Sequence, residues 1–340
     1  MTASLNFSLK HYNTFAIDAT AARFVTLETA ADFRSMATQL PSDGGLFFIL
    51  GGGSNVVFRD RYEGTVIHPV NKGVSLIEKN DSSCIVEAAA GEVWADFVDS
   101  CIAHGWYGLE NLAGIPGTVG AAPVQNVGAY GSEAKDVIYS IHCFEIGSGD
   151  ELWIPAADCQ FAYRWSRFKG EWANRYLIDR VRFRLSLSFT PNLSYKALAA
   201  AFPPPCSLPP AEQARLLADT VVSIRDSKLP NPKQIGSAGS FFKNPVVDST
   251  VYQRLKTQFP DIVAFPLDDG NVKLAAGWLI EQCGWKGRKL GPVGVYDKQA
   301  LVLVNLGNAT GKDVETLANT IINDVKSKFS ITISPEAIYV

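Results

Sequence analysis

The segment 111–131 constrains the fold more than any other part of the sequence. It contains five glycines, two prolines and several alanines, and it carries no charged side chain. Glycine and proline at this density exclude a long regular helix, and the apolar composition does not suit a solvated linker. A buried loop must still find hydrogen-bond partners for its backbone. The segment is therefore either a tightly packed loop or a loop whose backbone lies against a large bound molecule.

A second glycine-rich segment lies earlier in the chain, where 51–55 read Gly-Gly-Gly-Ser-Asn. Apolar residues on each side predict strands at 46–50 and 56–58, so the glycines connect two strands. Val56 occupies the position of the third glycine in the dinucleotide fingerprint G-x-G-x-x-G, which excludes the usual Rossmann motif. The turn is either an ordinary glycine turn or a row of backbone N–H groups that holds a pyrophosphate.

Ser240 follows the small residues of 236–239 and precedes Phe241 and Phe242. Small residues let a ligand approach the backbone closely, and we expect the two aromatic rings to shield this place from water. The Ser240 hydroxyl is therefore either a hydrogen-bonded turn residue or a proton donor to a bound molecule.

Arginines occupy two different settings. Arg164 lies among the aromatic residues of 161–169, where it either stacks structurally or binds a carboxylate through two hydrogen bonds. Arg182 and Arg184 alternate with apolar residues along 181–189, and this alternation predicts the solvated face of a strand.

Hydrophobic periodicity predicts the remaining elements, and turn residues separate them. Thr29 and Asp32 have the form of a capping box for a helix that ends within 41–45. A proline-rich loop is expected at 203–210, and the break at 226–233 predicts the last domain boundary. Strands are expected at 65–68, 84–88, 137–146 and 300–305, and helices at 93–102, 211–225, 251–259, 275–283 and 314–329.

Charge and composition exclude several classes of protein. The net charge is −3 without a concentrated basic run, so we expect no nucleic-acid partner. No leader or membrane-spanning stretch is recognisable, and we expect a cytoplasmic protein without membrane contact. The six cysteines are scattered, which suits reduced and mostly buried thiols. The four histidines lack metal-ligand spacing, so no metal site is expected.

Four segments in the same order resemble the type I UDP-N-acetylmuramate dehydrogenases, also called UDP-N-acetylenolpyruvoylglucosamine reductases. The segments are 50–56, 115–131, 239–245 and 335–336, and the resemblance extends from Asn13 to the C-terminus. It implies an α+β fold of the vanillyl-alcohol oxidase type, in which two domains bind FAD and a C-terminal α+β domain binds the substrate. The corresponding ranges are 1–72, 73–226, which includes a substrate loop at Tyr195, and 227–340.

The resemblance also implies a reaction in peptidoglycan synthesis. NADPH reduces non-covalently bound FAD, which then reduces UDP-N-acetylglucosamine enolpyruvate to UDP-N-acetylmuramate. Hydride addition places negative charge on the substrate carboxylate, and a proton must reach the carbon that bears it. By resemblance, Ser240 is the proton donor, Arg164 stabilises the enol carboxylate, and Glu336 is their acidic partner. By residue type alone, Glu336 is an ordinary solvated carboxylate.

The remaining site residues are implied by the resemblance as well. The positions that bind the substrate diphosphate match Tyr195, Lys228, Asn244 and Gln299, although Lys228 by itself reads as a surface lysine. The positions that match FAD contacts are Gly51, Gly52, Gly53, Ser54, Asn55, Pro116, Gly117, Gly120, Gln125, Asn126, Gly128 and Tyr130.

Some features depart from the family pattern or leave other functions open. Ala121 and Ala122 stand where many members carry a hydroxyl or a glycine, and Tyr296 stands where type I members often carry histidine. Two other functions stay open, a flavin oxidase of the same superfamily and a non-catalytic nucleotide-sugar sensor. The presence of both Ser240 and Arg164 favours the reductase, for which we expect a monomer.

Overall fold

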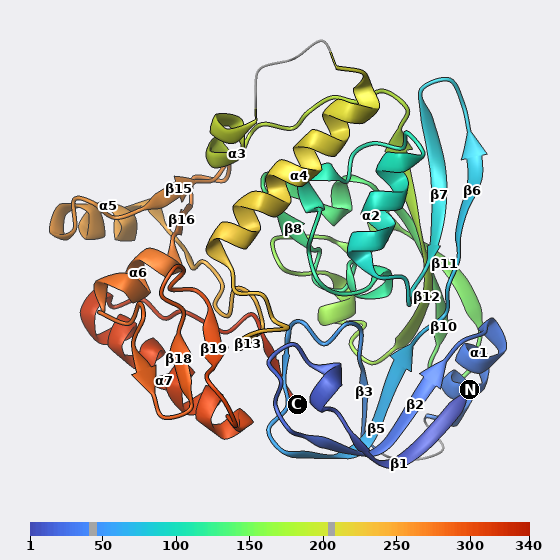
Figure 1. Cartoon of the computed structure of the whole chain (residues 1–340), viewed down its shortest axis with the longest axis horizontal. Coiled ribbons are helices and arrows are strands. Elements are labelled where there is room, and N and C mark those ends of the chain that lie inside the picture. The colour runs from blue at the N-terminus through green and yellow to red at the C-terminus, as the bar shows by residue number, and fades with distance from the viewer. Residues whose placement is uncertain (41–45, 203–207) are drawn as a thin grey trace. The chain divides into compact units, whose positions relative to one another are not determined.

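The structure is a computed structural model of the 340-residue chain, and it describes residues 1–40, 46–202 and 208–340. Helices and mainly antiparallel strands are mixed along the chain, as the α+β prediction requires (Figure 1). Contacts within the chain define two compact units. Unit 1 comprises Met1–Phe7, Ala21–Gly52 and Glu63–Ser227, and unit 2 comprises Ser8–Thr20, Gly53–Tyr62 and Lys228–Val340.

A four-stranded sheet with the order β1-β2-β5-β3 lies near the start of the chain. Helix α1 follows β2 and begins at Thr29, whose hydroxyl accepts a hydrogen bond from the Asp32 N–H while the Asp32 carboxylate accepts one from the Thr29 N–H. The Met1 amino group donates to the same carboxylate and holds the pKa of Asp32 at about 2. The bounds are β1 Thr2–Ser8, β2 Thr20–Leu27, α1 Ala30–Gln39, β3 Phe47–Ile49 and β5 Arg61–Pro69.

The main sheet of unit 1 has five antiparallel strands in the order β11-β10-β12-β7-β6. Alternate residues of β12 enter a large hydrophobic core, to which helices α2 and α4 contribute Trp94 and Leu217. The bounds are β6 Val74–Lys79, β7 Ser83–Ala89, α2 Trp94–Ala103, β10 Ile138–Glu145, β11 Glu151–Pro155, β12 Tyr176–Ser186, α3 Lys196–Ala201 and α4 Pro210–Lys228.

The glycine-rich segment 111–131 folds into short turns packed on this core. Leu112, Val119 and Ala122 are buried in it, which fixes the loop without a long element. The elements here are the 3-10 turns Glu110–Leu112, Val119–Ala121 and Ala134–Asp136, and the two-residue strands β8 Gly128–Ala129 and β9 Ser132–Glu133.

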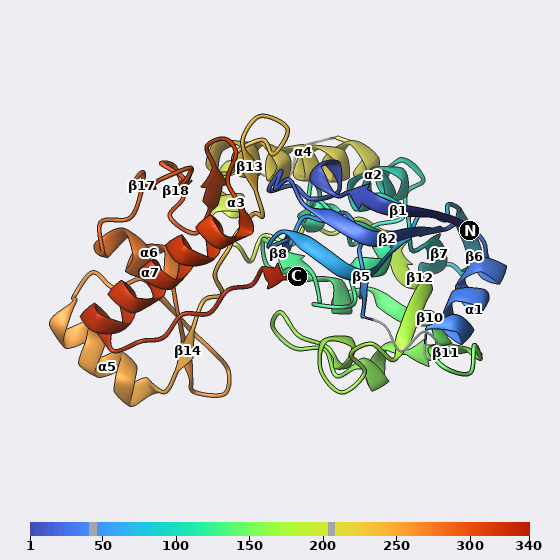
Figure 2. The same ribbon diagram turned by 90° about the horizontal axis from the view of Figure 1, so that it is seen from below.

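Unit 2 contains a sheet with the order β13-β19-β18-β17, against which α7 packs, and a small sheet β14-β16-β15 (Figure 2). A capping box between Thr310 and Asp313 begins α7, and one face of the helix is buried from Val314 to Phe329. The last strand, β20, runs parallel to β4. The bounds are β4 Val56–Val57, β13 Gly236–Ser237, β14 Val246–Val247, α5 Ser249–Gln258, β15 Ala264–Pro266, β16 Val272–Leu274, α6 Ala276–Gln282, β17 Lys289–Leu290, β18 Val293–Val295, β19 Leu303–Asn305, α7 Gly311–Phe329 and β20 Ile338–Tyr339.

The structure confirms most of the predicted elements but changes several of their bounds and one interpretation. The helix predicted at 211–225 extends from Pro210 to Lys228, and the strand predicted at 300–305 covers only Leu303–Asn305. Arg182 is not simply solvated, because it donates to Glu87 and lies 3.7 Å above the ring of Trp153. The predicted end of the first helix and most of the proline-rich loop lie outside the described residues.

Two further sequence expectations concern cysteines and membrane segments. Cys84, Cys101, Cys143, Cys159 and Cys283 are free, and the first four are buried, which confirms the expected reduced thiols for this described set. Among the helices within the described ranges, none is both long enough and apolar enough to cross a bilayer.

Candidate active site

The glycines at the end of β3 make room for close contact between two backbone segments of unit 1. A Cβ placed on Gly52 would lie 2.7 Å from the Gly117 Cα, and one on Gly51 would lie 2.9 Å from the Thr118 hydroxyl. Any side chain at Gly52 would therefore collide with backbone atoms. The two glycine-rich segments that the sequence singled out are direct neighbours here.

The backbone N–H groups of these neighbours provide a set of unused donors. Within the part of the chain that the structure describes, the N–H groups of Gly51, Gly52, Gly117 and Thr118 donate no hydrogen bond. Donors grouped in this way suit the oxygens of a diphosphate, which accept several hydrogen bonds at once. The strand that leads into them is held by His68, which contacts the Leu50 carbonyl at 2.8 Å and whose pKa is lowered by burial.

The segment 117–120 is held by backbone hydrogen bonds to the turn that joins β7 to α2. The Gly120 N–H donates to Ala90, the Val119 N–H donates to Glu92, and the Gly117 carbonyl accepts from Trp94. A Cβ on Gly120 would lie 2.6 Å from the Ala90 Cβ, so glycine is needed for this approach. The turn 90–94 is thus the backbone support of the segment.

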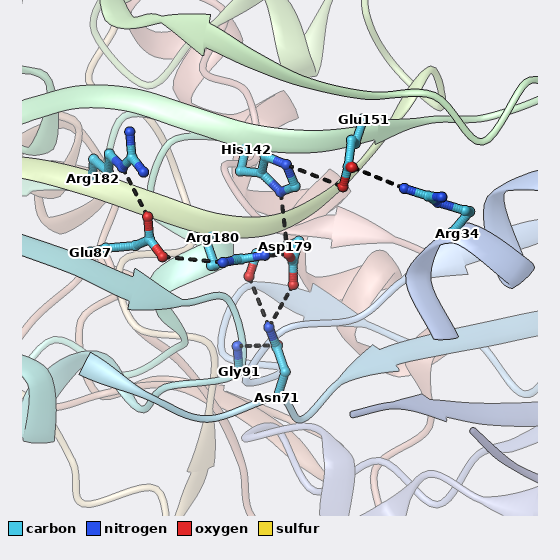
Figure 3. Close-up of polar contacts among 9 residues, drawn as sticks. All are labelled: Arg34, Asn71, Glu87, Gly91, His142, Glu151, Asp179, Arg180 and Arg182. Atoms are coloured by element: carbon cyan, nitrogen blue, oxygen red, sulfur yellow. Dashed lines mark hydrogen bonds and ion pairs between the residues drawn. The ribbon is translucent and has the colours of Figure 1, made fainter. Parts of the chain in front are cut away.

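A buried polar cluster, which Figure 3 shows, supports the turn 90–94. The Asp179 side chain is almost wholly buried, and its carboxylate accepts from Asn71 at 2.9 Å and contacts the His142 Nδ1 at 3.2 Å. The Asn71 side-chain oxygen Oδ1 accepts from the Gly91 N–H at 3.0 Å, and the Asp179 backbone carbonyl accepts from the Ala90 N–H at 2.8 Å. Sequence reasoning missed Asn71 and Asp179, because 108 positions separate them.

The second half of the glycine-rich segment carries the predicted residues Gln125, Asn126, Gly128 and Tyr130. Asn126 has no exposed surface, and its amide donates to the Glu133 carboxylate at 2.9 Å. Tyr130 is half-buried, burial raises its pKa, and its ring packs edge-on against Tyr195 at 5.2 Å between centroids. The predicted flavin and substrate tyrosines are therefore neighbours within unit 1.

Arg164 also lies in unit 1, at the tip of a tight turn. Its guanidinium donates to the Gly128 carbonyl at 2.8 Å and lies 5.3 Å from the centre of the Tyr163 ring. Both alternatives left open by the sequence are therefore compatible with this geometry, since stacking on Tyr163 and binding of a carboxylate do not exclude each other.

In unit 2, the structure brings Ser240 and Glu336 onto adjacent backbone segments. The Glu336 N–H donates to the Phe241 carbonyl at 2.7 Å, the Lys243 N–H donates to Ser334 at 2.9 Å, and Phe242 forms an isolated bridge with Pro335. The two segments are thus paired antiparallel. Because they lie far apart in the chain, no local sequence pattern predicts this pairing. Glu336 is half-buried.

The surroundings of Ser240 differ from the expectation that its aromatic neighbours shield the hydroxyl. Ser240 is exposed, whereas Phe241 and Phe242 are buried in the interior of the protein. Alternation along an extended segment explains the difference at Phe241, because consecutive side chains point to opposite sides. The aromatic rings anchor the backbone that presents the hydroxyl.

The last residue of the first glycine-rich segment contacts the Glu336 segment. The Asn55 side-chain amide donates to the Glu336 carbonyl at 3.2 Å, and the Asn55 carbonyl accepts from Ile338. Gly53 permits the turn, with φ at +64° and with no space for a Cβ, which would lie 2.0 Å from the Tyr12 carbonyl oxygen. Gly53, Ser54 and Asn55 therefore belong with Glu336 in unit 2.

Two predicted substrate residues meet at the start of α6. The Asn244 side-chain oxygen accepts from the Ala276 N–H at 2.9 Å, and a Cβ on Gly277 would lie 3.1 Å from the Gln299 side-chain oxygen. Lys228, the last residue of α4, is half-buried and begins the C-terminal segment of unit 2.

Unit 2 also has a cavity of about 1120 Å³ that the sequence did not predict. Lys10, Arg59 and Lys312 line it together with Asp18 and Glu315, so charges of both signs face it. The predicted catalytic and substrate residues are not among those that line this cavity.

Comparison with known proteins places this geometry in a class. Residues 21–154 match the family described as FAD binding domain, and residues 231–340 match the family described as UDP-N-acetylenolpyruvoylglucosamine reductase, C-terminal domain. The fold and the two matched domains therefore define a flavin-dependent oxidoreductase of α+β architecture, with an FAD-binding domain and the C-terminal domain of this reductase family.

Similar sequences narrow the class to one family. The reductase of Neisseria meningitidis serogroup B is 47% identical over 328 residues, which cover 96% of this chain and 94% of the relative. That of Burkholderia pseudomallei is 46% identical over 334 residues, covering 98% and 95%. The crystal structure of the Thermus caldophilus enzyme has a TM-score of 0.68 at 24% identity and covers 99% of this chain and 98% of its own. The chain belongs to the UDP-N-acetylenolpyruvoylglucosamine reductases, and its cofactor is FAD.

Proposed function

We propose that this chain catalyses the NADPH-dependent reduction of UDP-N-acetylglucosamine enolpyruvate to UDP-N-acetylmuramate, a step of peptidoglycan synthesis. Membership of the family over nearly the whole chain supports the reaction. The observation that carries the assignment of residues is the antiparallel pairing of the Ser240 and Glu336 segments, because it brings two residues that are distant in sequence onto neighbouring stretches of backbone.

The residues of unit 1 suit the diphosphate of FAD. The donors of Gly51, Gly52, Gly117 and Thr118 lie on adjacent backbone segments and have no acceptor within the described residues, and anions bind well at such groups. Bound FAD supplies hydride transfer between NADPH and the vinyl carbon of the substrate. The proposed FAD contacts in unit 1 continue through Gly120 and Gln125 to Tyr130, and those in unit 2 are Gly53, Ser54 and Asn55.

In this proposal Ser240 delivers a proton to the substrate carbon that bears the carboxylate. The exposed hydroxyl is held by buried aromatic neighbours, so its backbone is fixed while its Oγ stays accessible to a substrate. A hydroxyl is a weak acid, but the enolate of the substrate is a strong base, and substrate binding excludes water from the site. The proton lost from Ser240 is regained from solvent after product release.

Arg164 and Glu336 have electrostatic roles in the same proposal. Negative charge grows on the substrate carboxylate, and the Arg164 guanidinium, held by the Gly128 carbonyl, stabilises it there. Glu336 assists through a hydrogen bond as an acid on the segment paired with Ser240.

For the substrate diphosphate we propose Tyr195, Lys228, Asn244 and Gln299. Lys228 supplies a positive charge and the others supply hydrogen bonds. Asn244 and Gln299 lie together at the start of α6, which supports a common role for them.

We also propose that the FAD is not covalently attached, in contrast to many flavin oxidases. Cys101 is fully buried, and burial raises the pKa of its thiol. His104 contacts the Ser100 carbonyl and stacks on Trp106 at 4.6 Å between ring centroids. Cys101 is thus a core thiol with little nucleophilic thiolate, and His104 is held at the C-terminal end of α2. This favours the reductase over an oxidase of the same superfamily.

The partner and location of the enzyme follow from its substrates. We propose a monomer that acts in the cytoplasm, where NADPH and UDP-sugars are available, without nucleic acid or membrane as a partner. The proposed sites need one copy of each residue from a single chain.

An anaerobic experiment in two steps tests the function. NADPH is added to the purified holoenzyme, and the flavin absorbance is expected to bleach. UDP-N-acetylglucosamine enolpyruvate is then added, and the oxidised flavin spectrum is expected to return. Bleaching without return would contradict the substrate, and a protein that binds no FAD would contradict the flavoprotein assignment itself.

A further inference from the structure

We propose that Ser166 and Asn126 are positioning residues for Arg164, and that they do so by fixing its turn on the segment 124–128. This inference rests on the role proposed above for Arg164. It concerns only residues of unit 1, where the turn and the segment both lie.

The turn that carries Arg164 is tight and strained. Tyr163 and Arg164 are its two central residues, and Ala162 and Trp165 close it with two backbone hydrogen bonds of 3.0 and 3.1 Å. Arg164 has a φ of +54°, the left-handed region that residues with a side chain rarely adopt. Such a conformation persists only where the surrounding structure holds it.

Two buried polar side chains keep the turn in this conformation. The Ser166 hydroxyl donates to the Val124 carbonyl at 2.6 Å, and the Asn126 amide donates to the Ala162 carbonyl at 3.1 Å. Both Ser166 and Asn126 are completely inaccessible to solvent. The two donor side chains are therefore shielded from water, whereas the accepting residues Val124 and Ala162 are partly exposed. The two hydrogen bonds attach both sides of the turn to one short segment.

Asn126 is itself rigidly held. Its side-chain NH₂ group also donates to the Glu133 carboxylate at 2.9 Å, and its side-chain oxygen Oδ1 accepts from the Lys135 N–H at 3.0 Å. An asparagine with both ends engaged cannot rotate without breaking several hydrogen bonds. It therefore holds the turn at a fixed position relative to the segment 124–128.

The guanidinium completes this arrangement because it is tied to the same segment. Arg164 donates to the Gly128 carbonyl at 2.8 Å, and Gly128 is also a proposed flavin contact. The turn and the end of the side chain therefore share one support with the cofactor. A shift of the turn would move the positive charge away from the carboxylate on which negative charge grows, and small misplacements of such groups are costly in rate.

The variant Ser166→Ala tests the inference in the holoenzyme. Flavin reduction by NADPH should stay close to the wild-type rate, while reoxidation by UDP-N-acetylglucosamine enolpyruvate should slow roughly 10- to 100-fold, the range associated with misplacement by about 1 Å. Ser140→Ala is the matched control, because Ser140 is a buried serine of unit 1 on β10 whose partners across the sheet are Pro155 and Arg182. It should leave both rates unchanged.

A double-mutant cycle separates a positioning role from a structural one. If Ser166 acts through Arg164, then Ser166→Ala should lose most of its effect when Arg164→Lys is already present, because interacting residues are not additive. Ser166→Cys replaces the hydroxyl by a larger thiol that is a weaker donor, and it should show a loss of the same kind if Ser166→Ala folds poorly. The inference would be overturned if Ser166→Ala slowed reoxidation by the same factor with Arg164 as with Arg164→Lys. It would also be overturned if Ser166→Ala slowed flavin reduction and flavin reoxidation equally. Failure of the wild type to reoxidise would instead overturn the proposed function.

Discussion

At the residue scale, unusual backbone conformations coincide with several residues proposed for chemistry. Asn126, Tyr130 and Arg164 all have φ near +50° although each carries a side chain. Such positions cost free energy and are often kept where function needs them. Ser330, which ends α7 in the same conformation, shows that a helix end also uses this geometry.

Tyr195→Phe should weaken substrate binding. The variant keeps the ring that packs against Tyr130 but loses the hydroxyl proposed to contact the diphosphate. Loss of one hydrogen bond to a charged group predicts a substrate Kd roughly 10-fold higher, with flavin reduction by NADPH unchanged. Tyr139→Phe, at an exposed tyrosine on β10, is the control. Unchanged affinity in Tyr195→Phe would argue against this contact.

The sequence indicated some of these residues and could not indicate others. Ser240 and Arg164 stand in local settings that distinguish them within the sequence itself, and the family resemblance gave them roles. Ser166 has no such setting, because the carbonyl that it contacts lies 42 positions away. Residues that act by supporting another residue leave no local pattern.

At the scale of elements, the turn between β7 and α2 joins the main sheet to the proposed flavin segment. It accepts hydrogen bonds from the N–H groups of Val119 and Gly120, and it donates to Asn71 and Asp179 through the N–H groups of Gly91 and Ala90 (Figure 3). The buried cluster therefore stabilises the shape of the segment as well as the sheet.

Asn71→Ala should accordingly reduce the affinity for FAD. The variant removes the acceptor of the Gly91 N–H and one partner of the buried Asp179 carboxylate. We expect the Kd for FAD, measured by quenching of flavin fluorescence, to rise roughly 10-fold, which corresponds to a loss of about 1.4 kcal/mol. Glu87→Gln alters the outer part of the same cluster and should change FAD binding much less. Loss of thermal stability at unchanged FAD affinity would contradict the proposed support.

Elements differ in how far sequence could predict them. Helices α1 and α7 both begin at capping boxes, whose two partners are three residues apart. The prediction included the box of α1, but it began the last helix at 314 instead of Gly311. The contact of Asn55 with Glu336 spans 281 positions, and neither residue carries a pattern that names the other. Pairing of β4 with β20 escaped prediction for the same reason.

At the scale of the whole molecule, the residues proposed for the reaction are divided between the two compact units. Arg164 and Tyr195 belong to unit 1, whereas Ser240, Glu336 and Lys228 belong to unit 2. The α+β fold class was predictable from the family resemblance. The sequence did not predict that Ser8–Thr20 and Gly53–Tyr62 belong to unit 2. Hydrophobic periodicity predicts whether a segment forms a helix or a strand, but it does not predict which compact unit the segment joins. The division into 1–72, 73–226 and 227–340 stays a prediction.

The measurement that tests the central claim most directly is stopped-flow spectroscopy of Ser240→Ala. NADPH should reduce the flavin of this variant at nearly the wild-type rate, because that step needs no proton from Ser240. Reoxidation by UDP-N-acetylglucosamine enolpyruvate should be about 10²- to 10⁴-fold slower, the usual contribution of a positioned acid. An equal loss in both steps, or none in the second, would contradict the role of Ser240 as proton donor.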